Sequence, residues 1–207
     1  MKLKKKIRNT LIVLFVIMVG IGSYFLYKNI LEDPTQKEIK VVNKIDKYGY
    51  ELKDNKPKKY KEMFEELKEI LTQKEVNEEK YVKKISEMFI YDFYSLNDKT
   101  SKTDIGGVDF VYSGIRENFL KNAQDTYYKY VENNIYDNRK QSLPVVSNIT
   151  IDSVDKESYE YEDKSDDEAY NVKVSWTYTD DKYTEYQKDA KLVFIHDDIK
   201  LSLVELQ

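Results

Sequence analysis

The sequence predicts an α+β protein with an N-terminal transmembrane helix, followed by about three helices packed on a curved antiparallel sheet. Two successive patterns of apolar residues along the chain predict this fold. Apolar side chains recur at helical spacing between residues 57 and 134, and they alternate with period two after Pro144. Helices that precede a run of strands favour an antiparallel sheet covered by helices on one face.

The first element is an uncharged run from Thr10 to Tyr27, TLIVLFVIMVGIGSYFLY. As an α-helix it would span about 27 Å, enough for the hydrocarbon core of a bilayer. Basic residues precede it, at Lys2, Lys4, Lys5, Lys6 and Arg8. Positive flanks stay in the cytoplasm, so we expect a single-pass protein of the cell membrane with a cytoplasmic tail (1–9), a span (10–27) and an extracellular C-terminal domain.

A cleaved signal peptide is the alternative interpretation of this run. Its basic start and apolar middle fit that interpretation as well. The run is long for a signal peptide, however, and no A-x-A cleavage site follows it. We therefore favour a retained membrane anchor.

The part beyond the span divides into a juxtamembrane spacer (28–47) and one α+β domain (48–207). Six of the 34 basic residues flank the span and no acidic residue precedes Glu32, which leaves 28 basic and 38 acidic residues outside, a net charge of −10. An acidic exterior argues against nucleic-acid binding. The chain has no cysteine, so the domain must be stable without disulfides.

Three helices are expected in the first half of the domain. The first has Asp54 or Asn55 as its cap and Pro57 in its first turn, and Asn77 caps the second. The third runs from about Ser113 to Asn134. Their apolar stripes are Tyr60, Met63, Phe64, Leu67, Ile70 and Leu71; Tyr81, Val82, Ile85, Met88, Phe89 and Phe93; and Ile115, Phe119, Leu120, Ala123, Tyr127, Tyr130 and Val131.

Strands are expected before and after these helices. A short strand covers Tyr48–Leu52, and long strands cover Val146–Val154, Val172–Tyr178, Tyr186–Ile195 and Ile199–Leu206. Tyr159 and Tyr161 extend the first long strand or begin another, and the acidic run Glu157–Glu168 is expected as an exposed turn. Short connections make the strands antiparallel hairpins. The expected shape is a cone that can enclose a hollow.

This succession, after one N-terminal span, resembles the nuclear-transport-factor-2-like fold. More narrowly, it resembles the scaffold subunit of type IV secretion systems and its Gram-positive conjugation counterparts, whose outer domains oligomerise in the transfer channel. A second resemblance is to uncharacterised single-span proteins of Gram-positive bacteria, and it is carried by Glu78–Val111, EEKYVKKISEMFIYDFYSLNDKTSKTDIGGVDFV. That group implies no activity.

No catalytic, cofactor or metal site is predicted. His196 is the only histidine and is expected in a solvated turn. The acidic run lacks the alternating spacing and central glycine of a calcium loop. Gly106–Gly107 lack the phosphate-loop pattern and are expected to allow a positive φ turn before the third helix.

Asp92, Asp109 and the tyrosines Tyr127, Tyr128 and Tyr130 are the remaining candidates. In enzymes of the fold that the chain resembles, a hollow can hold an Asp base and a Tyr donor. The preferred interpretation of the tyrosines is a half-buried core. We also expect Trp176, which alternates with Val174 and Tyr178, to pack in the core.

These observations favour a non-catalytic, membrane-anchored assembly or scaffold domain of a cell-envelope complex, serving conjugative transfer or another envelope process. Its expected partners are the membrane and other proteins, including self-association through the exterior domain. An extracytoplasmic domain that binds or senses a small molecule in its hollow is the alternative. A third possibility is an isomerase-type enzyme, which would need a buried acid–base pair.

Overall fold

The computed structural model describes residues 17–24 and 39–207, and the chain divides into two units, Met1–Glu38 and Ile39–Gln207. In the first unit, residues 17–24 are helical. Within the described ranges no helix has the length and apolar character needed to cross a membrane. Most of the expected anchor, residues 10–16 and 25–27, lies outside the described residues, as do the basic tail 1–9 and positions 28–38 of the spacer.

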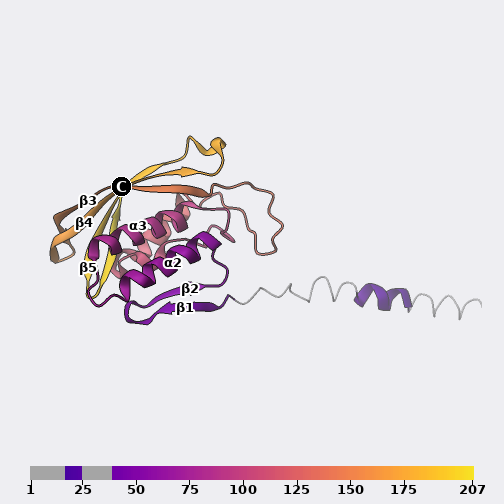
Figure 1. The fold of residues 1–207 in the computed structure, drawn as a ribbon. Helices are drawn as coiled ribbons and strands as arrows, with labels where there is room; N and C mark the ends of the chain where they lie inside the picture. The colour runs from indigo at the N-terminus through magenta and orange to yellow at the C-terminus, as the bar shows by residue number, and fades with distance from the viewer. Residues whose placement is uncertain (1–16, 25–38) are drawn as a thin grey trace, which may run out of the picture. The chain divides into compact units, whose positions relative to one another are not determined.

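The second unit is a mixed α+β fold in which helices pack against antiparallel sheets, as the sequence predicts (Figure 1). Its helices are α2 (Lys58–Leu71), α3 (Glu78–Tyr94) and α4 (Arg116–Asp125). A four-stranded sheet in the order β3-β4-β5-β6 is formed by β3 (Val146–Tyr161), β4 (Lys164–Tyr178), β5 (Asp189–Asp197) and β6 (Lys200–Leu206). A two-stranded sheet pairs β1 (Val41–Ile45) with β2 (Tyr50–Lys53).

The β1–β2 hairpin begins earlier than the sequence pattern indicates. The expected spacer reached residue 47, but Val41–Ile45 form strand β1. Asn43 of this strand contacts helix α2, since its amide nitrogen donates to Glu65 at 2.6 Å and its oxygen accepts from Lys68 at 2.7 Å. These polar contacts replace the apolar alternation by which a strand is recognised in a sequence.

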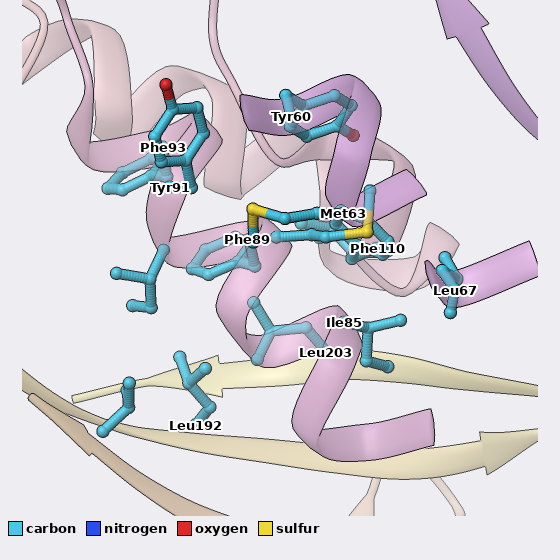
Figure 2. Packing of buried hydrophobic residues seen from close by; sticks show 14 of the residues in the cluster. Tyr60, Met63, Leu67, Ile85, Phe89, Tyr91, Phe93, Phe110, Leu192 and Leu203 are labelled. Atoms are coloured by element: carbon cyan, nitrogen blue, oxygen red, sulfur yellow. The ribbon is translucent and has the colours of Figure 1, made fainter. Parts of the chain in front are cut away.

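Helices α2 and α3 lie side by side, and α3 is the central element of the core (Figure 1). The expected cap of α3 is confirmed, because the Asn77 side chain accepts a hydrogen bond from the Lys80 N–H at 2.8 Å. The expected caps of α2 are wrong, because Pro57 holds that position and makes no side-chain bond. In Figure 2, Ile85 and Phe89 of α3 lie between two layers, formed by Met63 and Leu67 on α2 and by Leu192 and Leu203 on the sheet.

The third helix is shorter than predicted. It ends at Asp125, and Thr126 leaves helical geometry with φ −118° and ψ −94°. Adjacent residues of a helix point about 100° apart, so a continuous helix would turn either Tyr127 or Tyr128 away from the core. The break lets both rings pack inward, and Tyr128, which is fully buried, donates to the Phe93 carbonyl at 2.6 Å.

The acidic run Glu157–Glu168 is not a turn, which corrects the expectation. It forms the paired ends of β3 and β4, and only Glu162 and Asp163 lie between the strands. Register shifts along β3 interrupt the ladder, and such bulges bend a strand. Tyr159 and Tyr161 thereby pack on a second buried cluster, made by Tyr112, Ala169, Val193, Ile195 and Val204. Acidic and aromatic side chains alternate here, so the run has an apolar face that its charge conceals.

Candidate functional site

Helix α3 carries a buried ionic centre at Asp92, whose partners come from the connections before α2 and after α3. One carboxylate oxygen lies 2.6 Å from the Lys56 ammonium and 2.9 Å from that of Lys99, and the other accepts from the Gly107 N–H at 2.8 Å. Burial alone would raise the pKa of Asp92, but the charges of Lys99 and Lys56 outweigh it and hold this pKa well below its usual value. With its oxygens occupied by internal donors, Asp92 has a structural role and is not a free base.

The Gly106–Gly107 loop seats this centre on α3. Gly107 has φ +74°, as expected, and a Cβ there would meet the Phe89 ring at 2.6 Å. A Cβ at Gly106 would overlap the Asp92 backbone. Asp109 is exposed, and no hydrogen bond within the described part of the chain joins it to Asp92. The two candidate aspartates are therefore not brought together as an acid–base pair.

His196 lies in strand β5 rather than in a solvated turn, which corrects the prediction. Its Nδ1 is 2.8 Å from the Asp166 carboxylate, its backbone N–H donates to the same oxygen at 2.7 Å, and its Nε2 is 3.5 Å from Glu78. Burial opposes ionisation of Asp166, yet these bonds from His196 keep its pKa below the usual value. The imidazole joins β4 and β5 to the start of α3, and among the described residues its two ring nitrogens are paired with carboxylates rather than with a hydroxyl.

Metal-ligand geometry is also lacking among the residues that the structure describes. No three His, Asp or Glu side chains in those ranges lie so as to hold a metal ion. The carboxylates of the acidic run are spread along two strands, with Lys156 paired to Glu168 at 3.4 Å.

The candidate tyrosines divide between core and surface. Tyr128 is buried, as expected. Tyr127 is half-buried, stacks on Phe93 with ring centroids 5.8 Å apart, and donates to the Tyr94 carbonyl at 3.2 Å. Tyr130 is 75% exposed, so the expectation of a half-buried core is wrong for this residue. A large aromatic ring is thus presented to solvent beside two that are packed.

Tyr130 belongs to a surface groove of about 430 Å³, which we call the tyrosine groove. Three connections form it: the segment after α3, which supplies Leu96, the α4–β3 connection and the β4–β5 connection. Its apolar lining comprises three tyrosines and three aliphatic residues, Tyr127, Tyr130, Tyr186, Leu96, Val131 and Leu143. Tyrosine is enriched in protein interfaces because it combines a large apolar face with a polar tip.

The walls of the tyrosine groove are held by internal hydrogen bonds. The Gln141 amide donates to the Tyr130 carbonyl at 2.8 Å, and its oxygen accepts from the Glu132 N–H at 3.0 Å. The Tyr178 hydroxyl donates to the Gln187 carbonyl at 2.8 Å. These bonds join two parts of the α4–β3 connection and tie the β4–β5 connection to strand β4, so these walls of the groove are held in place before any partner binds.

Behind the groove lies tightly packed aromatic core. Trp176, the only tryptophan, is buried as predicted, and its ring centroid is 4.3 Å from that of Tyr94. Burial and the Tyr178 hydrogen bond raise the pKa of Tyr127 far above its ordinary value, so this hydroxyl stays neutral. Glu185 is the charged residue among those that line the groove.

Sequence reasoning did not find Tyr186, Leu143 or Gln141 as site residues. The available signal was Tyr183 and Tyr186 in a connection between strands, where tyrosines have no periodic pattern to satisfy. Aromatic side chains in surface connections are a feature of binding sites.

Comparison with protein-family models, curated proteins and solved structures finds no match for this chain. The functional argument is therefore made from the tyrosine groove and the arrangement of the fold.

Proposed function

We propose that this chain is a non-catalytic, membrane-anchored assembly protein whose exterior domain binds a polypeptide partner through the tyrosine groove. The observation that carries the proposal is Tyr130, a ring 75% exposed on a groove whose walls are held by internal hydrogen bonds. An exposed aromatic ring backed by rigid structure can become a binding hot spot, because little conformational entropy is lost when a partner covers it.

The proposed anchor is the uncharged run 10–27 behind its basic tail, with the domain on the extracellular side. The proposed fold is nuclear-transport-factor-2-like. Supporting it, helices precede an antiparallel meander, and α3 packs on the face of the sheet that carries Leu192 and Leu203. By this likeness the domain would act in a cell-envelope complex such as a conjugation channel, as a scaffold without chemistry of its own.

The alternative, a small-molecule sensor that uses a hollow, is less well supported by the packing. Phe89 stacks on Phe93 with centroids 5.4 Å apart, and Tyr94 lies against Trp176, so aromatic rings fill the space between helices and sheet. An isomerase-type enzyme would need a free buried base. Asp92 is buried but bound by two lysines.

A single-cysteine cross-linking experiment tests the proposal. The chain has no cysteine, so Tyr130→Cys creates a unique attachment point for a photoreactive benzophenone on the full chain in its host cells. Tyr136→Cys is the control, because Tyr136 is also exposed but does not line the groove. We expect discrete polypeptide adducts from position 130 and few from 136. Equal labelling at both positions, or no polypeptide adduct at 130, would contradict the proposal.

A further inference from the structure

We infer that the exposed side of the β1–β2 hairpin docks on the surface of the membrane that holds the proposed anchor, by contact with anionic lipid headgroups. This inference rests on the proposed function, because it takes the anchor from it and adds a second contact with the same bilayer. Three observations point to it: the uneven charge of the domain, the side chains that the hairpin exposes and the position of the hairpin in the chain.

The charge of the domain is divided unevenly along the chain. Residues 39–61, which form the hairpin and the start of α2, contain eight lysines and three acidic residues, a net charge of +5. Residues 62–207 contain 19 basic and 32 acidic residues, a net charge of −13. Near an anionic surface the first segment is attracted and the remainder is repelled, so the field of the surface turns the hairpin toward it.

The two sides of the hairpin differ in chemistry. Ile45, Tyr50 and Leu52 are buried in the core, and their neighbours along each strand are exposed. Toward its open end the hairpin, with the two residues before it, exposes three aliphatic side chains and three lysines. We call this set the hairpin patch: Ile39, Lys40, Val41, Val42, Lys44 and Lys53.

A β-bulge leaves two successive valines at the surface. The register of β1 with β2 shifts between Val41 and Asn43, so Val42 is an extra residue in β1. Ile39, Val41 and Val42 are 52%, 41% and 56% exposed. Strand β1 pairs only with β2 and is an edge strand at the periphery of the domain (Figure 1). An apolar edge of this kind favours a covering partner, and the headgroup–acyl boundary of a bilayer accepts such side chains.

The lysines of the patch are available to headgroups. Within the described part of the chain no ion pair involves Lys40 or Lys53, and Lys44 pairs with Glu51 where both side chains are about half exposed. Lysine can lay its stem on apolar surface while its ammonium stays at headgroup level. A soluble polyanion would engage the lysines alone and leave the aliphatic side chains in water, so the combination favours a lipid surface.

The hairpin patch follows directly on the connection to the proposed anchor. Residues 28–38 separate the run 10–27 from Ile39, so a fully extended connection measures about 40 Å at most. Such a tether gives the patch a high effective concentration at the bilayer, and weak contacts then suffice for docking. A soluble partner would have no such advantage.

Single-cysteine labelling of the full chain in vesicles tests the inference. The chain has no cysteine, so Val42→Cys accepts one environment-sensitive NBD fluorophore. Ile135→Cys is the matched control, because Ile135 is also an exposed aliphatic residue but lies in the α4–β3 connection. Vesicles of phosphatidylcholine are compared with vesicles that also contain phosphatidylglycerol. We expect the emission at position 42 to rise about twofold in the anionic vesicles only and to be quenched there by brominated lipid, with no change at position 135.

Charge variants separate the patch from the net charge of the protein. Changing Lys40, Lys44 and Lys53 together to Gln should weaken docking about 100-fold, because each lysine near an anionic surface contributes about fivefold. The same change at three exposed lysines elsewhere should leave docking within about twofold, because their charges are screened from the bilayer. These control positions are Lys102, Lys121 and Lys140.

An apolar variant distinguishes a lipid surface from a soluble polyanion. Val41→Ser keeps every charge and should weaken docking about threefold, because less apolar surface leaves water. Fluorescence of the buried Trp176 shows whether each variant is folded. Docking that Val41→Ser leaves unchanged and that soluble polyphosphate abolishes would identify a polyanion site instead, and would overturn the inference.

The remaining outcomes separate this inference from the proposed function. Equal changes at positions 42 and 135, no dependence on anionic lipid, or docking that survives the three Lys→Gln changes overturns the inference. A full chain that floats with phosphatidylcholine vesicles but does not dock on anionic ones keeps its anchor, and adducts from Tyr130→Cys would then support the proposed function alone. A full chain that floats with neither kind of vesicle refutes the anchor and this inference together.

Discussion

Asp92→Asn tests the structural role assigned to the buried ionic centre. Asparagine has nearly the shape of aspartate and can still accept from the Gly107 N–H, so the substitution removes mainly the charge. Two ammonium groups, those of Lys56 and Lys99, then face a neutral amide. The Lys99 side chain is only 2% exposed and cannot turn to water, and its remaining acidic partner is Asp98 at 2.9 Å.

The cost follows from the burial of these partners. Removing one member of a buried ion pair destabilises a protein by about 3–5 kcal/mol, because the other charge is left uncompensated. Lys56 is 19% exposed and can rotate outward, and Lys99 keeps Asp98, so we expect the lower end, about 3 kcal/mol. For a domain of this size that corresponds to a fall in Tm of about 6–12 °C.

Urea denaturation followed by Trp176 fluorescence measures this cost, since the single buried tryptophan reports on the core. Lys44→Met is the control: it breaks an ion pair with Glu51 whose side chains are about half exposed, and it should cost far less, because exposed ion pairs contribute little to stability. Asp92→Asn combined with Lys99→Met should cost less than the sum of the single changes. A loss for Asp92→Asn no larger than the control, or strict additivity, would refute the reasoning.

Two further outcomes follow from the same region. The pKa of Asp92 is lower in the folded chain than in the unfolded one, so its contribution is present above about pH 4 and is lost as the pH falls toward the folded value. The free energy of unfolding should therefore fall more steeply below pH 4 for the wild type than for Asp92→Asn, and parallel curves for the two proteins would contradict this. Gly107→Ala should destabilise by about 2–3 kcal/mol in the urea assay, because it adds a Cβ at φ +74° against the Phe89 ring. Gly49→Ala is the matched control. Its φ is +63° and the nearest atom to an added Cβ is the Lys200 ammonium at 3.6 Å, so it should cost about 1 kcal/mol; equal losses would count against the steric argument.

The local features of the fold were predictable because their causes are local. Asn77 caps α3 by accepting from the N–H three residues later. Val172, Val174 and Trp176 occupy every second position, which is the pattern of a strand with one buried face. Antiparallel pairing followed from the short connections. These statements need only the spacing of residues along a few turns or one hairpin.

The features that were missed depend on residues distant in the sequence. Helix α4 ends early because Tyr127 and Tyr128 both have places in a core built by α3. His196 is ordered by Asp166, which is 30 residues away, and by Glu78, which is 118 away. A lone polar residue near a turn carries no sign of such partners in its own neighbourhood.

The tyrosine groove was unpredictable for a related reason. Tyr130 and Gln141 lie at different points of the α4–β3 connection and Tyr186 lies in the β4–β5 connection, and the tertiary fold alone places them on one surface. The sequence identified Tyr130 as a candidate but assigned it to the core, because it shares helical spacing with Tyr127 and the helix was assumed to continue. The break after Asp125 is what turns the ring outward.

Strand β5 is buried on both of its faces. Leu192 and Phe194 are covered by the helices, and their neighbours Val193 and Ile195 by the folded-back tip of the β3–β4 hairpin. Antiparallel sheets commonly have one face exposed to solvent, where a substitution has little effect on stability. In β5, substitutions on either face of the strand would disturb packing. New surface contacts can therefore arise more easily in the segments that link one strand or helix to the next.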